Sequence, residues 1–112
     1  MKNLLIALMV LGLGTATAGG NLIVNEYQAD PDSTNGDANG DGTSSTTEDE
    51  FVELYNDTGV DLDVTGWTLA DGFGVRHTFP ANSIIPANCA LVVFSGGTPT
   101  GVFGNALVQT AS

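Results

Sequence analysis

Hydrophobic and polar residues alternate with a period of two along much of this chain, a pattern typical of β-strands with one buried face. The clearest case is the run EFVELYN, residues 50–56, in which Val52 and Leu54 share one face and the residues between them point the other way. No segment after residue 18 has a convincing helical period. Similar short runs predict further strands over residues 21–27, 67–69, 74–79, 89–94 and 105–110.

Turn-forming residues separate these runs. Gly, Pro, Asn and Asp recur between them, as at Asp71-Gly72, Pro80 and Pro86. Several short strands spaced by about 8–12 residues indicate an all-β fold of the sandwich type. The run CALVVF, residues 89–94, is almost wholly apolar and is therefore expected to lie centrally in a sheet.

The first 18 residues have the layout of a secretory signal peptide. Lys2 gives a positive start, an apolar run of 11 residues spans 4–14, and Ala16-Thr17-Ala18 supplies a small-residue cleavage signal. The apolar run is shorter than the roughly 20 residues that span a bilayer, which disfavours a retained anchor. We therefore expect an exported protein, secreted or placed at the cell surface or in the periplasm, that begins at Gly19 and is not inserted in the membrane.

Charge restricts the partners of this chain. The net charge is −11, and removal of Lys2 with the leader takes it from −11 to −12. All 13 acidic residues lie between Glu26 and Asp71. Nucleic acid and anionic membranes would be repelled, whereas cations would be attracted. The single cysteine, Cys89, excludes an internal disulfide and is expected to be a small buried residue.

Residues 30–49 do not fit the strand pattern and form a long acidic loop rich in Asp, Asn, Gly, Ser and Thr. Within it, DANGDGTSSTTE fits the twelve-residue calcium loop D-x-[DN]-x-[DN]-G-x5-E. Calcium prefers six to eight oxygen ligands. The candidate metal ligands are Asp37, Asn39, Asp41, Thr43 (through its carbonyl), Ser45 and Glu48.

The flanks of this motif argue against an ordinary EF-hand. Pro31 and Gly36 precede it and a predicted strand follows it, so neither flanking helix is expected. The site would then stand on another scaffold, and its ligand set could be irregular. Four neighbouring acids could replace some of the six: Asp30, Asp32, Asp49 or Glu50. The alternative is a solvated, mobile acidic loop that matches the pattern by chance.

No catalytic centre is expected. His77 is the only histidine, no nucleophile motif accompanies it, and it is interpreted as a surface residue of a strand. One His and one Cys are too few for a zinc site. Glu26 and Glu53 could be drawn as a carboxylate pair for glycoside hydrolysis, but each lies in a β run where a structural role is commoner.

The ordered words LIVNEYQAD, DEFVELYNDTGVDLDVTGWTLADG, RHTFP and IIPANCALVVF resemble the lamin tail domain, an immunoglobulin-like β-sandwich of nuclear lamins and exported bacterial proteins. The resemblance covers residues 21–94, and the leader favours the bacterial branch. It implies an immunoglobulin-like fold for residues 19–112. The expected core positions are Trp67, Leu69, Phe79, Val92 and Phe94.

The resemblance also implies a role in binding or scaffolding, for an unknown protein or a cell-surface partner. We therefore expect an exported, non-catalytic module with a calcium-binding loop. The alternative is an accessory domain cut from a larger secreted hydrolase or nuclease. Family members normally continue with further strands, so the chain is expected to be truncated at its C-terminus. It would then self-associate through an open sheet edge.

The leader generates the first prediction. Mass spectrometry of the exported protein should find Gly19 as the new N-terminus, because the signal Ala16-x-Ala18 places cleavage after Ala18. Membrane-bound protein that retains Met1 would contradict this prediction.

Overall fold

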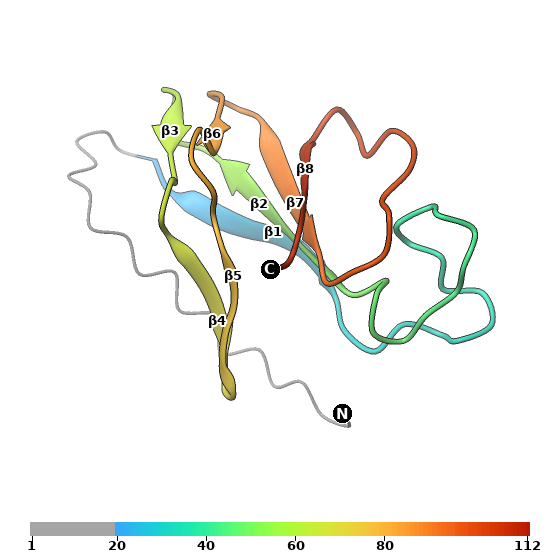
Figure 1. Ribbon diagram of the computed structural model, residues 1–112. Helices are drawn as coiled ribbons and strands as arrows, with labels where there is room; N and C mark the ends of the chain where they lie inside the picture. The colour runs from blue at the N-terminus through green and yellow to red at the C-terminus, as the bar shows by residue number, and fades with distance from the viewer. Residues whose placement is uncertain (1–19) are drawn as a thin grey trace.

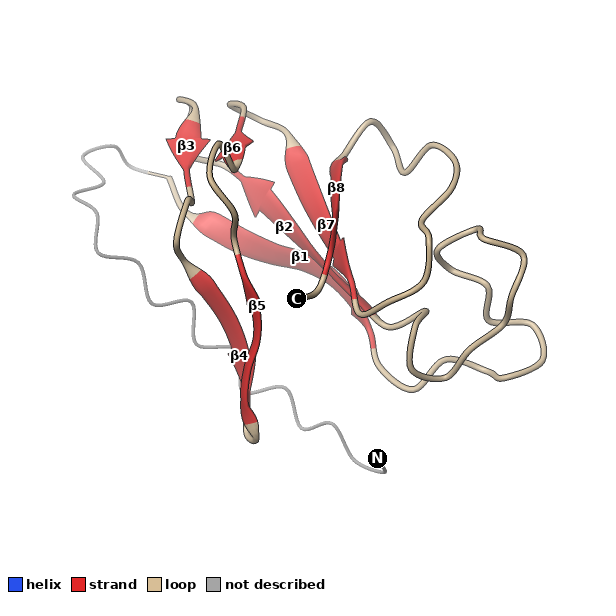
Figure 2. Cartoon of the chain, in the orientation of Figure 1, coloured by secondary structure: helices blue, strands red, loops and turns tan. Residues whose placement is uncertain are grey.

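The computed structural model describes residues 20–112, which form eight β-strands and no helix (Figures 1 and 2). The expected signal peptide lies outside the described residues. No helix in the described part is long and apolar enough to span a membrane. The strands are β1 (Leu22–Gln28), β2 (Phe51–Asn56), β3 (Leu62–Asp63), β4 (Thr68–Asp71), β5 (Gly74–Thr78), β6 (Ile84–Ile85), β7 (Ala90–Phe94) and β8 (Leu107–Thr110).

The larger sheet has the strand order β1-β2-β7-β8. β1 pairs with β2 and β2 with β7 in antiparallel fashion, whereas β8 runs parallel to β7. Leu54 lies opposite Leu91, and Val52 opposite Val93, so these four side chains share one face. Leu54, Leu91 and Val93 are buried, which identifies this face as the inner one.

Two short antiparallel strand pairs form the second layer. β3 pairs with β6 and β4 pairs with β5, both antiparallel, and they lie in front of the larger sheet in Figure 1. One hydrophobic core joins the two layers. It contains the inner face of the larger sheet together with Leu69 of β4, Phe79 after β5 and Ile85 of β6. The fold is thus an all-β, immunoglobulin-like sandwich, as the alternating pattern and the resemblance predict.

The expected core residues are mostly confirmed. Leu69, Phe79, Val92 and Phe94 are all buried, whereas Trp67 is only half-buried and packs against the core from its border. Val92 and Phe94 belong to the outer face of the sheet, because they alternate with Leu91 and Val93. Phe103 packs on Phe94 there, with 5.0 Å between ring centroids. The core therefore has a second, smaller part outside the sandwich.

The run CALVVF forms β7, which lies in the interior of the larger sheet. β7 is central, as its apolar composition predicts, because β8 pairs with the side that β2 leaves free. The expected association through an open sheet edge therefore does not involve β7 and stays a prediction for the remaining edges. Among the described strands, β1 and β8 form the edges of this sheet.

One buried amide connects the two layers. Asn56, at the end of β2, is fully buried, and its Nδ2 donates to the carbonyl oxygens of Ile85 (2.8 Å), Val60 (2.7 Å) and Pro86 (3.2 Å). Its Oδ1 accepts from the backbone N–H and the hydroxyl of Thr58, at 3.0 and 2.7 Å. The Asn56 side chain of the larger sheet thereby satisfies a carbonyl of β6, one of the loop between β2 and β3, and one of the loop after β6.

The amide yields the second prediction. Asn56→Asp removes both N–H donors and places an acceptor against three carbonyl oxygens, so it should lower the free energy of unfolding by at least about 2 kcal/mol. Urea denaturation measures this loss. Asn105→Asp is the matched control, because Asn105 is exposed and distant in sequence from the acidic residues. Equal stability of the two variants would contradict the role of Asn56.

Candidate functional site

The acidic segment between β1 and β2 folds as an ordered lobe without strands, which we call the acidic lobe (residues 30–49). It lies beside the connection that follows β7, as Figure 1 shows. The backbone N–H of Thr100 donates to the carbonyl of Asn39 at 2.8 Å. Gly40, with φ of 69°, is needed here, since an added Cβ would lie 2.4 Å from the Thr100 carbonyl oxygen. The acidic lobe therefore packs directly against the connection that follows β7.

The first half of the calcium-loop motif curls around its own side chains. Asp37 Oδ2 accepts from the N–H of Gly42 at 3.0 Å, and Asn39 Oδ1 accepts from the N–H of Asp41 at 2.9 Å. Asp41 Oδ1 accepts from the N–H of Thr43 at 2.9 Å. These three side chains are among the six predicted ligands. Each of them directs one oxygen toward the backbone of a single tight turn.

Asp41 also joins the lobe to the neighbouring connection. Its Oδ2 accepts from the N–H of Thr98 at 3.0 Å. The hydrogen bonds from the backbone of Thr98 and Thr43 hold the pKa of the Asp41 carboxyl below its usual value, because they favour the charged form. Gly97 leaves room for this contact, since a Cβ there would lie 2.6 Å from Asp41 Oδ2.

The centre of the lobe is Asp49, which lies just outside the motif. Its side chain is fully buried, and its two oxygens accept from the N–H groups of Asn39 (2.9 Å) and Ser45 (2.7 Å). One carboxylate therefore ties the beginning of the motif to its later part. Hydrogen bonds from backbone N–H groups to a carboxylate are stronger than those between two neutral groups.

The second half of the motif forms a capped turn. Ser45 Oγ accepts from the N–H groups of Glu48 (3.1 Å) and Thr47 (3.3 Å), in the manner of an N-cap residue in an S-x-x-E pattern. The Glu48 side chain is exposed and packs against Gly96, where a Cβ would meet its Cγ at 2.9 Å. Two of the six predicted ligands thus have local structural roles.

The fit to calcium is therefore partial. Asp37, Asn39 and Asp41 share one turn, while Ser45 and Glu48 lie in the next, and the described residues contain no group of three His, Cys, Asp or Glu side chains placed to hold a metal. Each oxygen that accepts one N–H retains a second lone pair for a cation. The turn can thus contribute ligands, but it does not form a closed cage.

The four replacement acids are spread around the lobe. Asp49 is its buried centre, and Asp32 Oδ1 accepts from the N–H groups of Thr34 and Asn35, which lowers the pKa of Asp32. The N–H of Asp30 donates to Glu50 Oε1 at 3.1 Å. Asp30 and Glu50 therefore belong to a different site, at the base of the lobe.

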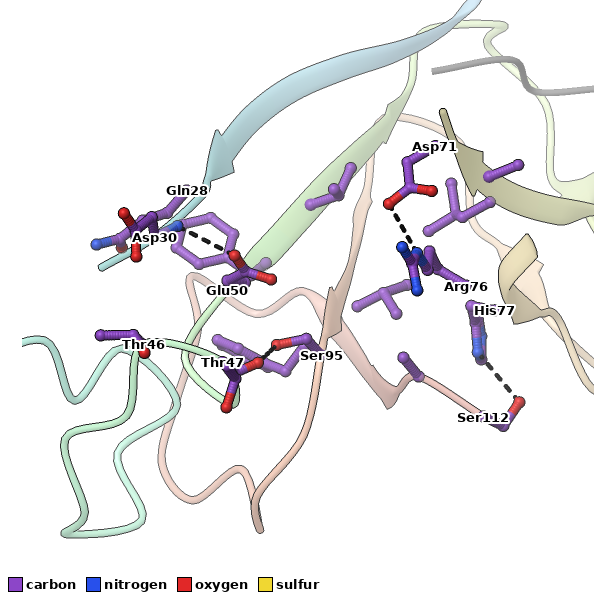
Figure 3. Close-up of a pocket in the computed structure, with 17 residues that line it drawn as sticks. Gln28, Asp30, Thr46, Thr47, Glu50, Asp71, Arg76, His77, Ser95 and Ser112 are labelled. Atoms are coloured by element: carbon purple, nitrogen blue, oxygen red, sulfur yellow. Dashed lines mark hydrogen bonds and ion pairs between the residues drawn. The ribbon is translucent and has the colours of Figure 1, made fainter. Parts of the chain in front are cut away.

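That site is a cleft of about 400 Å³ at the end of the sandwich (Figure 3). Apolar side chains from both layers line it: Phe51, Val52, Leu69, Val93 and Phe94. Figure 3 shows Gln28, Asp30 and Glu50 together on one side of it, with Arg76, His77 and Ser112 on the other. We call this space the interlayer cleft. Its volume lies within the range of small-ligand pockets.

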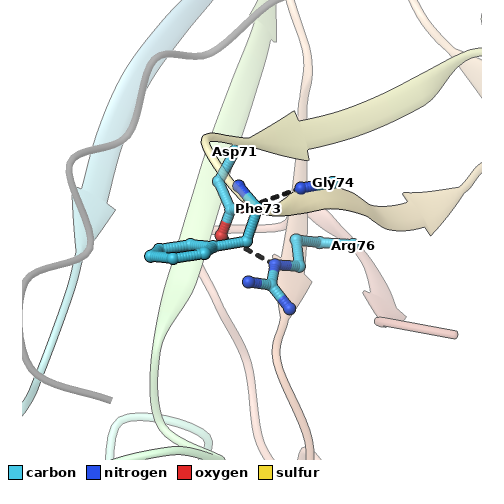
Figure 4. Close-up of polar contacts among 4 residues, drawn as sticks. All are labelled: Asp71, Phe73, Gly74 and Arg76. Carbon is cyan, nitrogen blue, oxygen red and sulfur yellow. Dashed lines mark hydrogen bonds and ion pairs between the residues drawn. The ribbon is translucent and has the colours of Figure 1, made fainter.

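The only arginine of the described residues, Arg76, is held at the rim by Asp71. Arg76 Nε donates to Asp71 Oδ2 at 2.7 Å, while Asp71 Oδ1 accepts from the N–H groups of Phe73 (2.8 Å) and Gly74 (3.1 Å) (Figure 4). The bond from Arg76 is the main cause of the lowered pKa of Asp71. The guanidinium also lies over the exposed Phe73 ring, 5.8 Å from its centre.

His77 is buried, so its interpretation as a surface residue is wrong. Ser83 Oγ must donate to the Pro80 carbonyl at 2.8 Å, because a carbonyl can only accept. Ser83 therefore accepts from Gln109 Nε2 at 2.9 Å, which orients Gln109 Oε1 toward His77 Nε2 at 2.7 Å. His77 Nε2 thus carries a proton, and this chain of bonds attaches β8 to the second layer.

The Glu26 and Glu53 pair lies elsewhere. The two residues are cross-strand partners on the outer face of β1 and β2, and Asn25 Nδ2 donates to Glu53 Oε1 at 2.7 Å. Glu26 is exposed, and neither carboxylate lines the interlayer cleft. This position supports the structural role that the sequence favours for them.

Comparison with known proteins gives one match. Residues 15–112 match the family model described as Lamin Tail Domain. No curated protein and no solved structure matched the chain.

The Asp41 contact generates the third prediction. A carboxyl whose pKa is lower in the folded state stabilises that state above its unfolded pKa, about 3.9, and this contribution is lost as the pH falls through the lower folded value. The melting temperature of Asp41→Asn should therefore lie below that of the parent at pH 6, and the difference should shrink below pH 4. A pH-independent difference would contradict the ionic contribution of Asp41.

Proposed function

Because the chain belongs to the lamin tail domain family, we propose that it is an exported, non-catalytic binding or scaffolding module whose acidic lobe binds calcium. The observation that carries the calcium proposal is the tight turn from Asp37 to Thr43. It gathers oxygens of two carboxylates and one amide on an ordered backbone. Hard oxygen ligands of this kind suit calcium.

Calcium would be held first by Asp37, Asn39 and Asp41. The nearest bases offer no competition, because Arg76 is the only Lys or Arg among the described residues and is bonded to Asp71. Bound calcium would neutralise part of the negative charge of the lobe. It would thereby stabilise the contact between the lobe and the connection after β7.

The interlayer cleft supports a binding role. Its lining contains one histidine, whose Nε2–H is engaged by Gln109, and Ser112 Oγ lies 3.5 Å from the other ring nitrogen. Two of the carboxylates at its rim are engaged: Glu50 accepts from the N–H of Asp30, and Asp71 accepts from a backbone N–H and from Arg76. These groups position loops and leave an apolar floor open, which favours recognition of a partner over chemistry on a substrate. Export is supported by the leader-like residues 1–18.

Calcium titration provides the fourth prediction. At a tenfold excess over a dissociation constant of about 10⁻⁴ to 10⁻³ M, calcium should stabilise the fold by about 1.4 kcal/mol. For a domain of this size, that gain raises the melting temperature by roughly 6–11 °C. Asp37→Asn with Asp41→Asn should remove the gain, because asparagine keeps one acceptor for each turn but loses the charge.

The control for this experiment is Glu26→Gln with Asp57→Asn. It removes the same two charges from exposed residues outside the lobe, and its calcium response should match that of the parent. An equal calcium response in both double variants would overturn the assignment to the lobe. Magnesium should raise the melting temperature less, because it requires a stricter octahedral geometry.

A further inference from the structure

The interlayer cleft has an apolar floor with two unneutralised acids at its rim. Glu50 Oε1 accepts from the N–H of Asp30, and neither carboxylate contacts a base in the described structure. The one nearby cation, Arg76, is bonded to Asp71. This opening has an excess of negative charge, because three acids (Asp30, Glu50 and Asp71) line it and only one base, Arg76, does. An occupant with an apolar body and a positive group would therefore complement the cleft.

The apolar surface continues from the cleft along β1. Tyr27 lies opposite Val52, and Val24 lies opposite Leu54, so both face the inner side of the sheet. Yet Tyr27 is 60% exposed and Val24 is 39% exposed. The second layer thus leaves this strip of the inner face uncovered. The strip adjoins the cleft through Val52, which lies opposite Tyr27 and lines the cleft.

The edge of β1 favours an extended occupant. No described strand pairs with the outer edge of β1, so that edge presents backbone donors and acceptors. An extended peptide can pair with such an edge and place alternate side chains on the adjacent face. A compact apolar molecule would leave these backbone groups without partners.

We propose that the interlayer cleft and the Val24–Tyr27 strip bind an extended, largely apolar peptide segment of another protein. A Lys or Arg of this segment lies between Asp30 and Glu50. A second copy of this chain is a poor source, because the expected exported form has a net charge of −12, which repels another copy, and Arg76 is its only Lys or Arg. This inference names the partner class of the proposed binding module and rests on that function.

The test uses the full chain and two synthetic peptides, KVTVTV and EVTVTV, both acetylated and amidated. NMR titration should show the largest amide shifts at Val24, Tyr27, Val52 and Leu69. The lysine peptide should bind at least tenfold more tightly than the glutamate peptide at low salt, and this preference should decrease as salt rises. Equal affinities, or shifts confined to other surfaces, would overturn the proposal.

Two variants separate the charged and apolar contributions. Asp30→Asn with Glu50→Gln keeps the acceptor for the Asp30 N–H and should reduce the preference for the lysine peptide to less than twofold. The control Glu26→Gln with Asp57→Asn should keep the full preference. Tyr27→Ser, at an exposed position, should weaken both peptides by a similar factor of about three to ten. A preference that both double variants lose equally would contradict the role of Asp30 and Glu50.

The result of the peptide test can be distinguished from the result of the calcium test. If neither peptide binds at millimolar concentration while calcium still raises the melting temperature, the peptide inference is wrong and calcium binding by the lobe stands. If the peptides bind as expected and calcium has no effect, the cleft assignment stands and the calcium assignment falls.

Discussion

The placement of β3 and β6 on the larger sheet depends on the buried amide of Asn56. Hydrophobic contact between the layers is not directional, so it does not by itself fix how the short strands β3 and β6 sit on the larger sheet. The amide supplies that direction, because its Nδ2 must meet the carbonyls near β6 and its Oδ1 must meet Thr58. Strands of two residues have too few ladder bonds to be placed by pairing alone. The polar contact in the core therefore makes the second layer specific.

A related principle shapes the acidic lobe. Its residues are too polar to form a hydrophobic core, so carboxylate and amide oxygens bound to backbone N–H groups replace one. Asp49 at the centre and Asp41 at the contact with Thr98 keep the lobe ordered without any base nearby. The same oxygens that order the lobe give it a concentrated negative charge. The same oxygens would thus serve structural order and calcium binding together, with one lone pair for a backbone N–H and another for the cation.

Much of the architecture could be predicted from the sequence, because alternation reports directly which face of a strand is buried. Six of the strands and the central place of β7 follow from it. The two-residue β3 is too short to show a period, and the parallel direction of β8 leaves no mark in its own residues. The burial of His77 leaves no mark in its own strand, because its partner, Gln109, is 32 residues away. The calcium pattern is ambiguous for a physical reason: the Asp, Asn and Ser residues that ligate metal also cap turns, as Ser45 does here.

The edge position of β8 has a consequence for the cleft. Among the described strands β8 pairs only with β7, and most of its side chains are exposed. A strand with few buried contacts opens locally at a lower free energy than the central strands of the same sheet. Ala111 and Ser112 extend from β8 into the wall of the cleft. Local opening of β8 would therefore also displace one wall of the cleft, and the hydrogen bond between Gln109 and His77 opposes it.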